Sequence, residues 1–151
     1  MDERVSRLKT PDDCAKFIAN ARKQRREDLV LEATQRAVEL RAITHGAGSQ
    51  VERECIEAIY AFEEVKSAEK KRLSPGKKVS RYRANRTWDM VTDHGILGAA
   101  ERAVDRRDAT TGFQALKEAG LERFAFESVI LRHPESFSAS AVARSRERMQ
   151  S

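Results

Sequence analysis

The sequence predicts an all-α protein: a single domain spanning residues 1–151 and built as a compact bundle of seven to eight helices. Three observations predict this class. Apolar residues recur every three to four positions along most of the chain, which is the spacing of one helix face. Capping residues and glycines stand at the ends of these periodic stretches. No two segments show the alternating apolar pattern of paired strands.

The first predicted helix opens at the sequence Thr10-Pro11-Asp12-Asp13. This start combines a capping hydroxyl, a proline in the first turn and two acids at the positive end of the helix dipole. Its apolar face continues through Phe17 and Ile18 and ends in the basic run 22–26. That polar run predicts a break before the next helix.

The second predicted helix begins near Glu27 and stops at His45-Gly46, where glycine permits a left-handed cap. The third begins at Ser49, and Glu52 three residues later completes a capping box. Its apolar face over residues 51–65 is broad, so we expect neighbours on more than one side and place this helix centrally. Residues 10–73 thus form a three-helix half.

A turn at Ser74-Pro75-Gly76 leads into a basic loop, residues 74–86, and residues 87–150 then predict a half of short helices. Glycine, proline and polar joints divide this half. The expected helices are Thr87–His94, Ile96–Asp105, Gly112–Ala119, Leu121–Arg132 and, capped by Ser138, Ala139–Met149.

Length and composition indicate a globular chain that can fold without disulfide bonds or structural metal ions. A chain of 151 residues can bury roughly 68–70% of its unfolded surface. No apolar run approaches the ~20 residues of a membrane helix, and the first residues lack the apolar core of a signal peptide. We therefore expect a cytoplasmic protein, with nucleoid association as an alternative, and no membrane partner. Cys14 and Cys55 occupy apolar positions and are expected to be buried, reduced thiols.

The strongest functional signal is the segment Lys70–Arg86, which holds eight Lys or Arg and no Asp or Glu. Residues 73–86 alone hold five cations and no acid, which equals the formal net charge of +5 of the whole chain. A nearly neutral body with one cationic segment predicts a localised anionic partner.

We therefore predict a nucleic-acid-binding protein, with double-stranded DNA favoured over RNA and no cofactor required. Lysine and arginine would neutralise phosphates, and a tyrosine between two arginines would stack on a base or sugar. The predicted contacts are Lys70, Lys71, Arg72, Lys77, Lys78, Arg81, Tyr82, Arg83 and Arg86. A second cluster adds Arg22, Lys23, Arg25 and Arg26, which an up-down-up arrangement of the first three helices would bring to the same end.

Two other interpretations of the basic loop stay open. It could be a solvated loop that only keeps the protein soluble, although such loops usually mix charges. It could also belong to an interaction or regulatory module that docks on an acidic protein partner. The sequence leaves homo-oligomerisation open as well.

Enzymatic chemistry is not indicated. Glu64-Val65-Lys66 has the acid-x-lysine form of metal-dependent nucleases, but those motifs lie on strands, whereas this one lies inside a helix. No histidine or cysteine spacing predicts a metal site. His45 and His94 precede helix-ending glycines, and His133 stands at a similar end before a proline. We predict a protein without catalytic or metal-binding residues.

The two glycine joints of the second half are not typical of a DNA-reading helix-turn-helix. At the Gly95 joint, Glu101 falls where an apolar residue is expected. After Gly120 the would-be recognition helix carries Glu122 and Glu127 and would meet phosphates poorly. Both joints predict plain helical hairpins, and the single Trp88 is expected in the core.

The second half also shows a resemblance carried by a series of short motifs. These are Arg86-Thr87-Trp88, His94-Gly95-Ile96, Gly112-Phe113, Phe124-Ala125-Phe126-Glu127, Leu131-Arg132-His133-Pro134 and Phe137-Ser138. In them the chain resembles an uncharacterised family of small bacterial all-helical proteins. The resemblance covers roughly the last 65 residues and, more loosely, the second and third helices. It implies a bacterial origin and brings no assigned activity.

Overall fold

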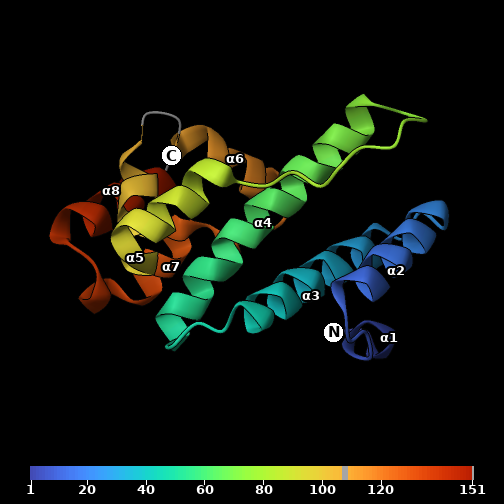
Figure 1. The fold of residues 1–151 in the computed structure, drawn as a ribbon, viewed down its shortest axis with the longest axis horizontal. Coiled ribbons are helices and arrows are strands. Elements are labelled where there is room, and N and C mark those ends of the chain that lie inside the picture. Colours follow the sequence, from blue (N-terminus) through green and yellow to red (C-terminus); the bar gives the residue numbers. More distant parts are fainter. Residues whose placement is uncertain (107–108, 151) are drawn as a thin grey trace.

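The computed structural model describes residues 1–106 and 109–150, and every regular element in these ranges is helical. The elements are α1 (Glu3–Ser6), α2 (Pro11–Lys23), α3 (Glu27–His45), α4 (Gln50–Leu73), α5 (Asn85–Asp105), α6 (Ala109–Glu118), the 3-10 turn η1 (Glu122–Phe124), α7 (Phe126–Arg132), the 3-10 turn η2 (Pro134–Ser136) and α8 (Ala139–Gln150) (Figure 1). The predicted all-α class with seven to eight helices is confirmed. The short α1 was not predicted.

The first half follows the predicted starts and stops. The Thr10 hydroxyl accepts a hydrogen bond from the Asp13 amide at 3.0 Å and caps α2. Gly46 ends α3 in the left-handed region, with φ at 77°. Ser49 caps α4 by accepting from the Glu52 amide at 3.2 Å. The predicted capping box is altered in one detail, since the Glu52 carboxylate accepts from the Ser49 hydroxyl at 3.0 Å.

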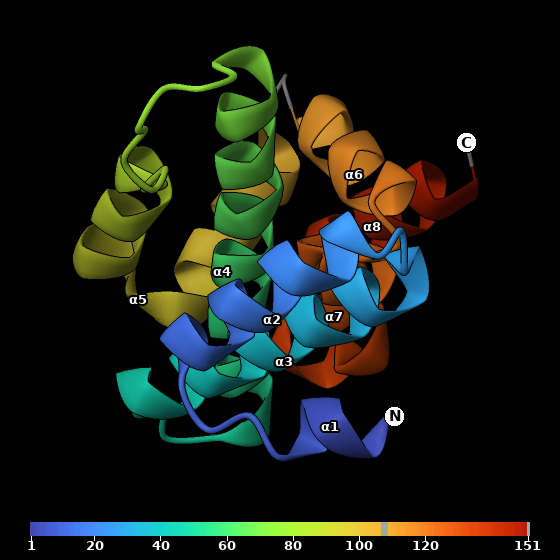
Figure 2. The same cartoon turned by 90° about the vertical axis from the view of Figure 1, so that its right-hand side faces the viewer.

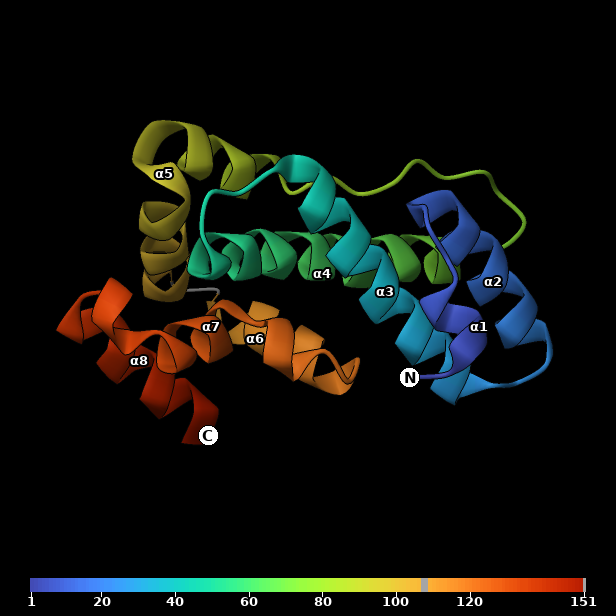
Figure 3. The ribbon, with the colours of Figure 1, turned by 90° about the horizontal axis from the view of Figure 1, so that it is seen from below.

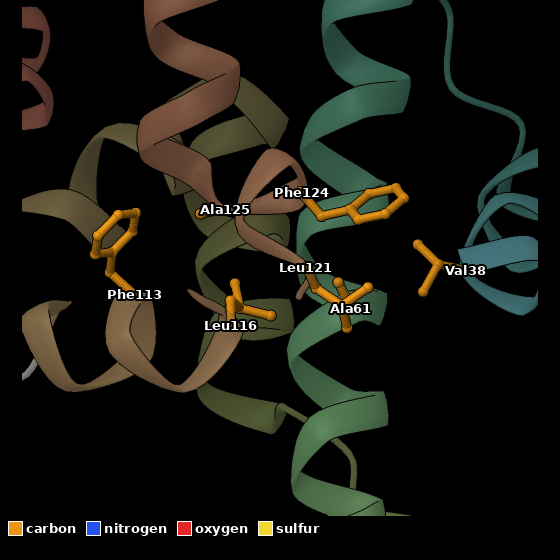
Figure 4. Packing of buried hydrophobic residues seen from close by; sticks show 7 residues of the cluster. All are labelled: Val38, Ala61, Phe113, Leu116, Leu121, Phe124 and Ala125. Carbon is orange, nitrogen blue, oxygen red and sulfur yellow. The ribbon is translucent and has the colours of Figure 1, made fainter. Parts of the chain in front are cut away.

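Helix α4 is central, as predicted. It packs against α3 and also against α5, α6 and α7, whereas α2 packs chiefly against α3 (Figure 3). One buried cluster joins α3, α4, α6 and the segment after α6 (Figure 4). Its members are Val38, Ala61, Phe113, Leu116, Leu121, Phe124 and Ala125. These side chains fix the second half of the chain onto α4.

Three features of the second half differ from prediction, the first being that α6 begins at Ala109 instead of Gly112 and ends at Glu118 instead of Ala119. Helix α5 bends at Gly95, with φ 79° and ψ 170°, so its two arms agree with the two predicted helices except that the first begins earlier, at Asn85 (Figure 3). The single helix predicted over 121–132 is wrong. An extended Ala125, with ψ 148°, separates η1 from α7. The break lets Phe124 enter the α3–α4 cluster while Phe126 packs against Val104 and Ile130 instead.

None of the helices in the described ranges is long and apolar enough to cross a membrane.

Candidate nucleic-acid interface

The basic loop after α4 folds back along the helix that precedes it. Lys70 donates its Nζ to the Ser80 carbonyl at 3.0 Å, and the Tyr82 amide donates to the Ser67 hydroxyl at 3.0 Å. Further along, the Ala84 amide donates to Glu63 Oε2 at 2.8 Å. Residues 80–84 of the predicted basic loop, 74–86, are therefore held against α4.

The spacing of these three hydrogen bonds explains why the loop can run straight along the helix. The loop contributes every second residue, and α4 contributes residues three to four positions apart. Two residues of extended chain cover about 6.6 Å, and three to four helical residues cover about 5–6 Å. Because these two lengths are similar, an extended segment that runs antiparallel to α4 can form a hydrogen bond to the helix at every second residue, from Ser80 to Ala84.

Glu63 is the side chain that holds the end of this segment. Glu63 is only 2% exposed. Its carboxylate accepts hydrogen bonds from the Ala84 amide, from Trp88 Nε1 at 2.7 Å and from Arg81 Nη2 at 3.2 Å. A buried carboxylate is tolerated when its oxygens are bonded in this way. Sequence reasoning missed this role. The available signal was an acid four residues after Ile59, on the apolar face of a helix.

Three predicted contact residues of the loop are engaged inside the protein. Arg81, a predicted phosphate contact, pairs with Glu63 at 3.2 Å and with Glu64 at 2.6 Å. Tyr82 is half-buried, and its ring meets Phe62 edge to face at 6.0 Å between centroids. Arg83 lies over the Trp88 ring at 5.6 Å. These side chains shape the loop, and a nucleic acid would have to compete with their present contacts.

Two further predicted cations also have internal partners. Lys70 bonds the Ser80 carbonyl, as described, and Arg26 pairs with Asp28 at 3.0 Å. Arg86, at the start of α5, is exposed but lines a separate hollow beside α6. It therefore does not belong with the cations at the end of α4.

The remaining seven predicted cations form a surface that we call the basic end. All are exposed, and within the described residues none of their side chains forms a hydrogen bond or an ion pair. They are Arg22, Lys23 and Arg25 at the α2–α3 turn and Lys71, Arg72, Lys77 and Lys78 at the end of α4 and the start of the loop.

The fold brings the two parts of the basic end to the same end of the molecule. Figures 1 and 3 both show the α2–α3 turn and the end of α4 there. Arg22 and Lys71 line one hollow of about 710 Å³, which opens between the α2–α3 hairpin and α4. The predicted up-down-up arrangement of the three helices thus places both clusters as expected.

Arg25 is held in an unusual backbone conformation. Its φ of 56° makes it the one residue other than glycine in the left-handed region among residues 1–106 and 109–150. That region costs a residue with a side chain roughly 1–2 kcal/mol, which glycine avoids. The Arg26 amide bonds the Ala21 carbonyl at 2.9 Å across this turn, so the turn itself dictates the conformation.

Trp88 lies in the core, as predicted. It is 8% exposed, and its ring stacks on His45 and tilts against Tyr60, with centroids 5.3 Å apart in both cases. Because its Nε1–H donates to Glu63, the ring is fixed at both its apolar and its polar edge.

Glu64 of the acid-x-lysine motif is part of an ion-pair group in the middle of α4. It pairs with Arg81 and, at 3.4 Å, with Arg41. His133 contacts a different acid, with its Nε2 3.0 Å from Glu54 Oε2. In the part of the chain that the structure describes, no three His, Cys, Asp or Glu residues are grouped so as to hold a metal ion.

Both cysteines are buried free thiols, in agreement with the sequence. Burial raises the pKa of Cys55 to about 12, with smaller contributions from Glu54 and Glu52, and it also raises the pKa of Cys14. Since the thiolate is the reactive form, neither thiol is an available nucleophile at neutral pH.

The cysteines give a simple test of the fold. We expect iodoacetamide at pH 8 to label the native protein far more slowly than the urea-unfolded protein, because both thiols are buried and their pKa values are raised. Mass spectrometry of the labelled peptides measures labelling at both sites, and rapid native labelling of Cys55 would contradict its burial.

The free energy of unfolding should also fall as pH rises from about 9 towards 12, since the thiols of the unfolded chain lose their protons first.

Comparison with known proteins finds no match among family models, curated proteins or solved structures. The resemblance of the second half to a family of small bacterial helical proteins therefore stays a prediction.

Proposed function

We propose that the protein binds nucleic acid through the basic end, with double-stranded DNA as the first candidate. One observation carries the proposal: two basic clusters from different parts of the sequence meet at one end of the fold, and seven cations there have no partner within the described residues. Unpaired cations grouped on one surface are the arrangement that neutralises a run of phosphates.

Several arginines elsewhere on the surface are used differently. Arg123 pairs with Glu39 at 3.3 Å, Arg132 with Glu54 at 2.7 Å, and Arg144 with Asp105 at 3.1 Å. These pairs join elements of the fold and cancel charge locally. At the basic end, by contrast, the charge stays available to an external anion, and the exposed side chains keep the reach needed to follow a phosphate backbone.

The strained Arg25 also supports the proposal. Strained backbone positions tend to collect at functional sites. Here a long cationic side chain stands in a turn where glycine would be more stable, and the side chain forms no compensating contact in the described structure. An interaction outside the chain would account for an arginine at this position.

The proposal requires no catalytic step, and a DNA-binding role would place the protein in the cytoplasm, on the nucleoid. Glu64 is held by Arg81 and Arg41, so we expect DNA to remain intact when it is incubated with the protein and Mg²⁺. Cleavage that disappears in Glu64→Gln would overturn the non-enzymatic part of the proposal.

The salt dependence of DNA binding tests the proposal. If all seven cations contact phosphates, log affinity against log salt has a slope of about −6, at about −0.9 per contact. The variant Arg72→Gln/Lys77→Gln/Lys78→Gln should flatten this slope by about 3 and weaken binding at least tenfold at about 0.1 M salt. Fluorescence anisotropy with two unrelated duplexes measures both quantities.

The matched control removes the same charge elsewhere. Arg53→Gln/Arg102→Gln/Arg146→Gln changes three exposed arginines outside the basic end, and the slope should stay within experimental error of the parent. Equal losses in both variants would mean that net charge alone attracts DNA. A parent protein that binds neither duplex at about 50 mM salt, but binds an acidic protein at fixed stoichiometry, would favour the alternative of an interaction module.

Arg25→Gly separates stability from binding. We expect this variant to be more stable by about 0.5–1 kcal/mol, because glycine adopts the left-handed conformation without strain. The same variant should bind duplex DNA more weakly and lose about 0.9 from the salt slope. Thermal unfolding and anisotropy measure the two effects, and unchanged binding would remove Arg25 from the interface.

A further inference from the structure

A second hollow, outside the basic end, lies between α4, α6, α7 and the two ends of α5. Its volume is about 440 Å³, which falls within the range of about 300–1,000 Å³ typical of small-molecule sites. Figure 2 shows α6 lying beside α4, and the hollow is lined by residues of both helices. Among the residues that the structure describes, it shares no lining residue with the hollow beside the α2–α3 hairpin.

The walls of this hollow are largely apolar and rich in aromatic rings. Ile59 and Phe62 come from α4, Phe113 from α6, and Phe126 from α7. Gly112 adds an open stretch of helix backbone, where a methyl group would lie 3.7 Å from Phe62 Cε1. Such walls favour a flat, apolar ligand body that can meet the rings by stacking or edge contacts.

The charges that line the hollow are mainly positive. Arg86 is exposed, and its side chain forms no hydrogen bond or ion pair within residues 1–106 and 109–150. Lys66 Nζ lies 5.7 Å from the centroid of the Phe62 ring and 3.8 Å from Glu69 Oε2. The side chain of Glu69 is 43% exposed, so this ion pair is weak. Arg106 also lines the hollow.

Among the described residues, the single acid in the lining does not cancel this charge. Glu127 has a side chain only 5% exposed, and its Oε2 accepts from Arg148 Nη1 at 2.6 Å. Its negative charge is therefore already balanced by an arginine that is not part of the lining. An incoming anion would meet the cations of Lys66 and Arg86 rather than a carboxylate.

We propose that this hollow binds a small organic anion, specifically a monocarboxylate with an aromatic body. The ring of the ligand would lie against Phe62, Phe113 and Phe126. Its carboxylate would pair with Arg86, whose planar guanidinium suits a bidentate contact, and with Lys66. The site uses residues distinct from the seven cations of the basic end, so it does not depend on DNA binding.

Naphthalene-2-carboxylate is a suitable probe, and isothermal titration calorimetry measures its binding to the full chain. We expect saturable 1:1 binding, and at least tenfold weaker binding of the neutral isostere naphthalene-2-carboxamide. The variant Lys66→Gln/Arg86→Gln should weaken carboxylate binding at least tenfold and leave the carboxamide within threefold. The matched control Arg53→Gln/Lys117→Gln removes two exposed cations outside the hollow and should leave carboxylate binding within twofold.

A filling variant tests the position of the ligand. Gly112→Leu extends a side chain into the hollow and should abolish binding of both probes, with helical circular dichroism confirming that the variant folds. If it does not fold, the charge variants at the exposed rim still decide the question. Equal affinity for carboxylate and carboxamide, or no loss in Lys66→Gln/Arg86→Gln, would overturn the proposal. Tighter binding of AMP than of naphthalene-2-carboxylate would also overturn it, because the site would then take nucleotides.

Discussion

Replacement of Glu63 by alanine is expected to lower the free energy of unfolding by about 3–5 kcal/mol. The change removes the acceptor for three donors at once: the Ala84 amide, the Trp88 indole and the Arg81 guanidinium. Donors that are left without partners in a buried site cost their full desolvation free energy. Urea unfolding followed by Trp88 fluorescence measures the loss.

The same variant should release the segment that runs along α4. Because Ala84 is held by Glu63, its amide is expected to exchange with solvent much faster in Glu63→Ala, while amides near the α2–α3 turn keep the exchange rates of the parent. The matched control is Glu69→Ala, which removes a half-exposed acid from the same helix and should cost less than about 1 kcal/mol. A Glu63→Ala variant as stable as Glu69→Ala would show that Glu63 does not hold the loop.

Phe124→Ala is expected to cost about 3–5 kcal/mol as well, because it opens a cavity in the cluster that joins α3, α4 and the second half of the chain. Phe124 is 2% exposed, and its ring lies against Val38 and Ala61 in that cluster (Figure 4). Denaturant unfolding measures the loss, and the cooperativity of the transition shows whether the two halves still unfold together.

Phe62→Ala is the informative comparison for this prediction. Phe62 also lies on α4, but it is half-buried at the edge of the α4–α6 hollow. Its removal should therefore cost clearly less than that of Phe124, since less surface returns to water. Equal costs for the two variants would mean that the hollow is closed in solution.

The limits of prediction from sequence are clearest in the second half. Glycine at positions 95 and 120 correctly marked bends, because both adopt a positive φ that other residues avoid. The break at Ala125 carried no such signal, since alanine is an excellent helix former. The break is visible only in the folded packing: Phe124 belongs to the buried cluster that joins α3, α4 and α6, whereas Phe126 packs against the cluster that contains Val104 and Ile130.

The candidate interface, too, could be predicted from the sequence only in part. Charge counting found the basic segment and the second cluster, and helix order placed both at one end. It could not separate Arg81 and Arg83, which face α4 and Trp88, from Lys77 and Lys78, which face solvent. Both pairs look alike in the sequence, because the difference depends on acids and rings 5 to 18 positions away along the chain.

The all-α class, the helix caps, the glycine bends and the concentration of positive charge could be predicted from the sequence, because each depends on neighbouring residues or on composition. The path of the loop along α4, the role of Glu63 and the two hollows became visible only in the folded structure. These features arise from groups that meet only after folding. A buried carboxylate is stable only where the fold supplies several donors, and local sequence does not record which distant donors will arrive.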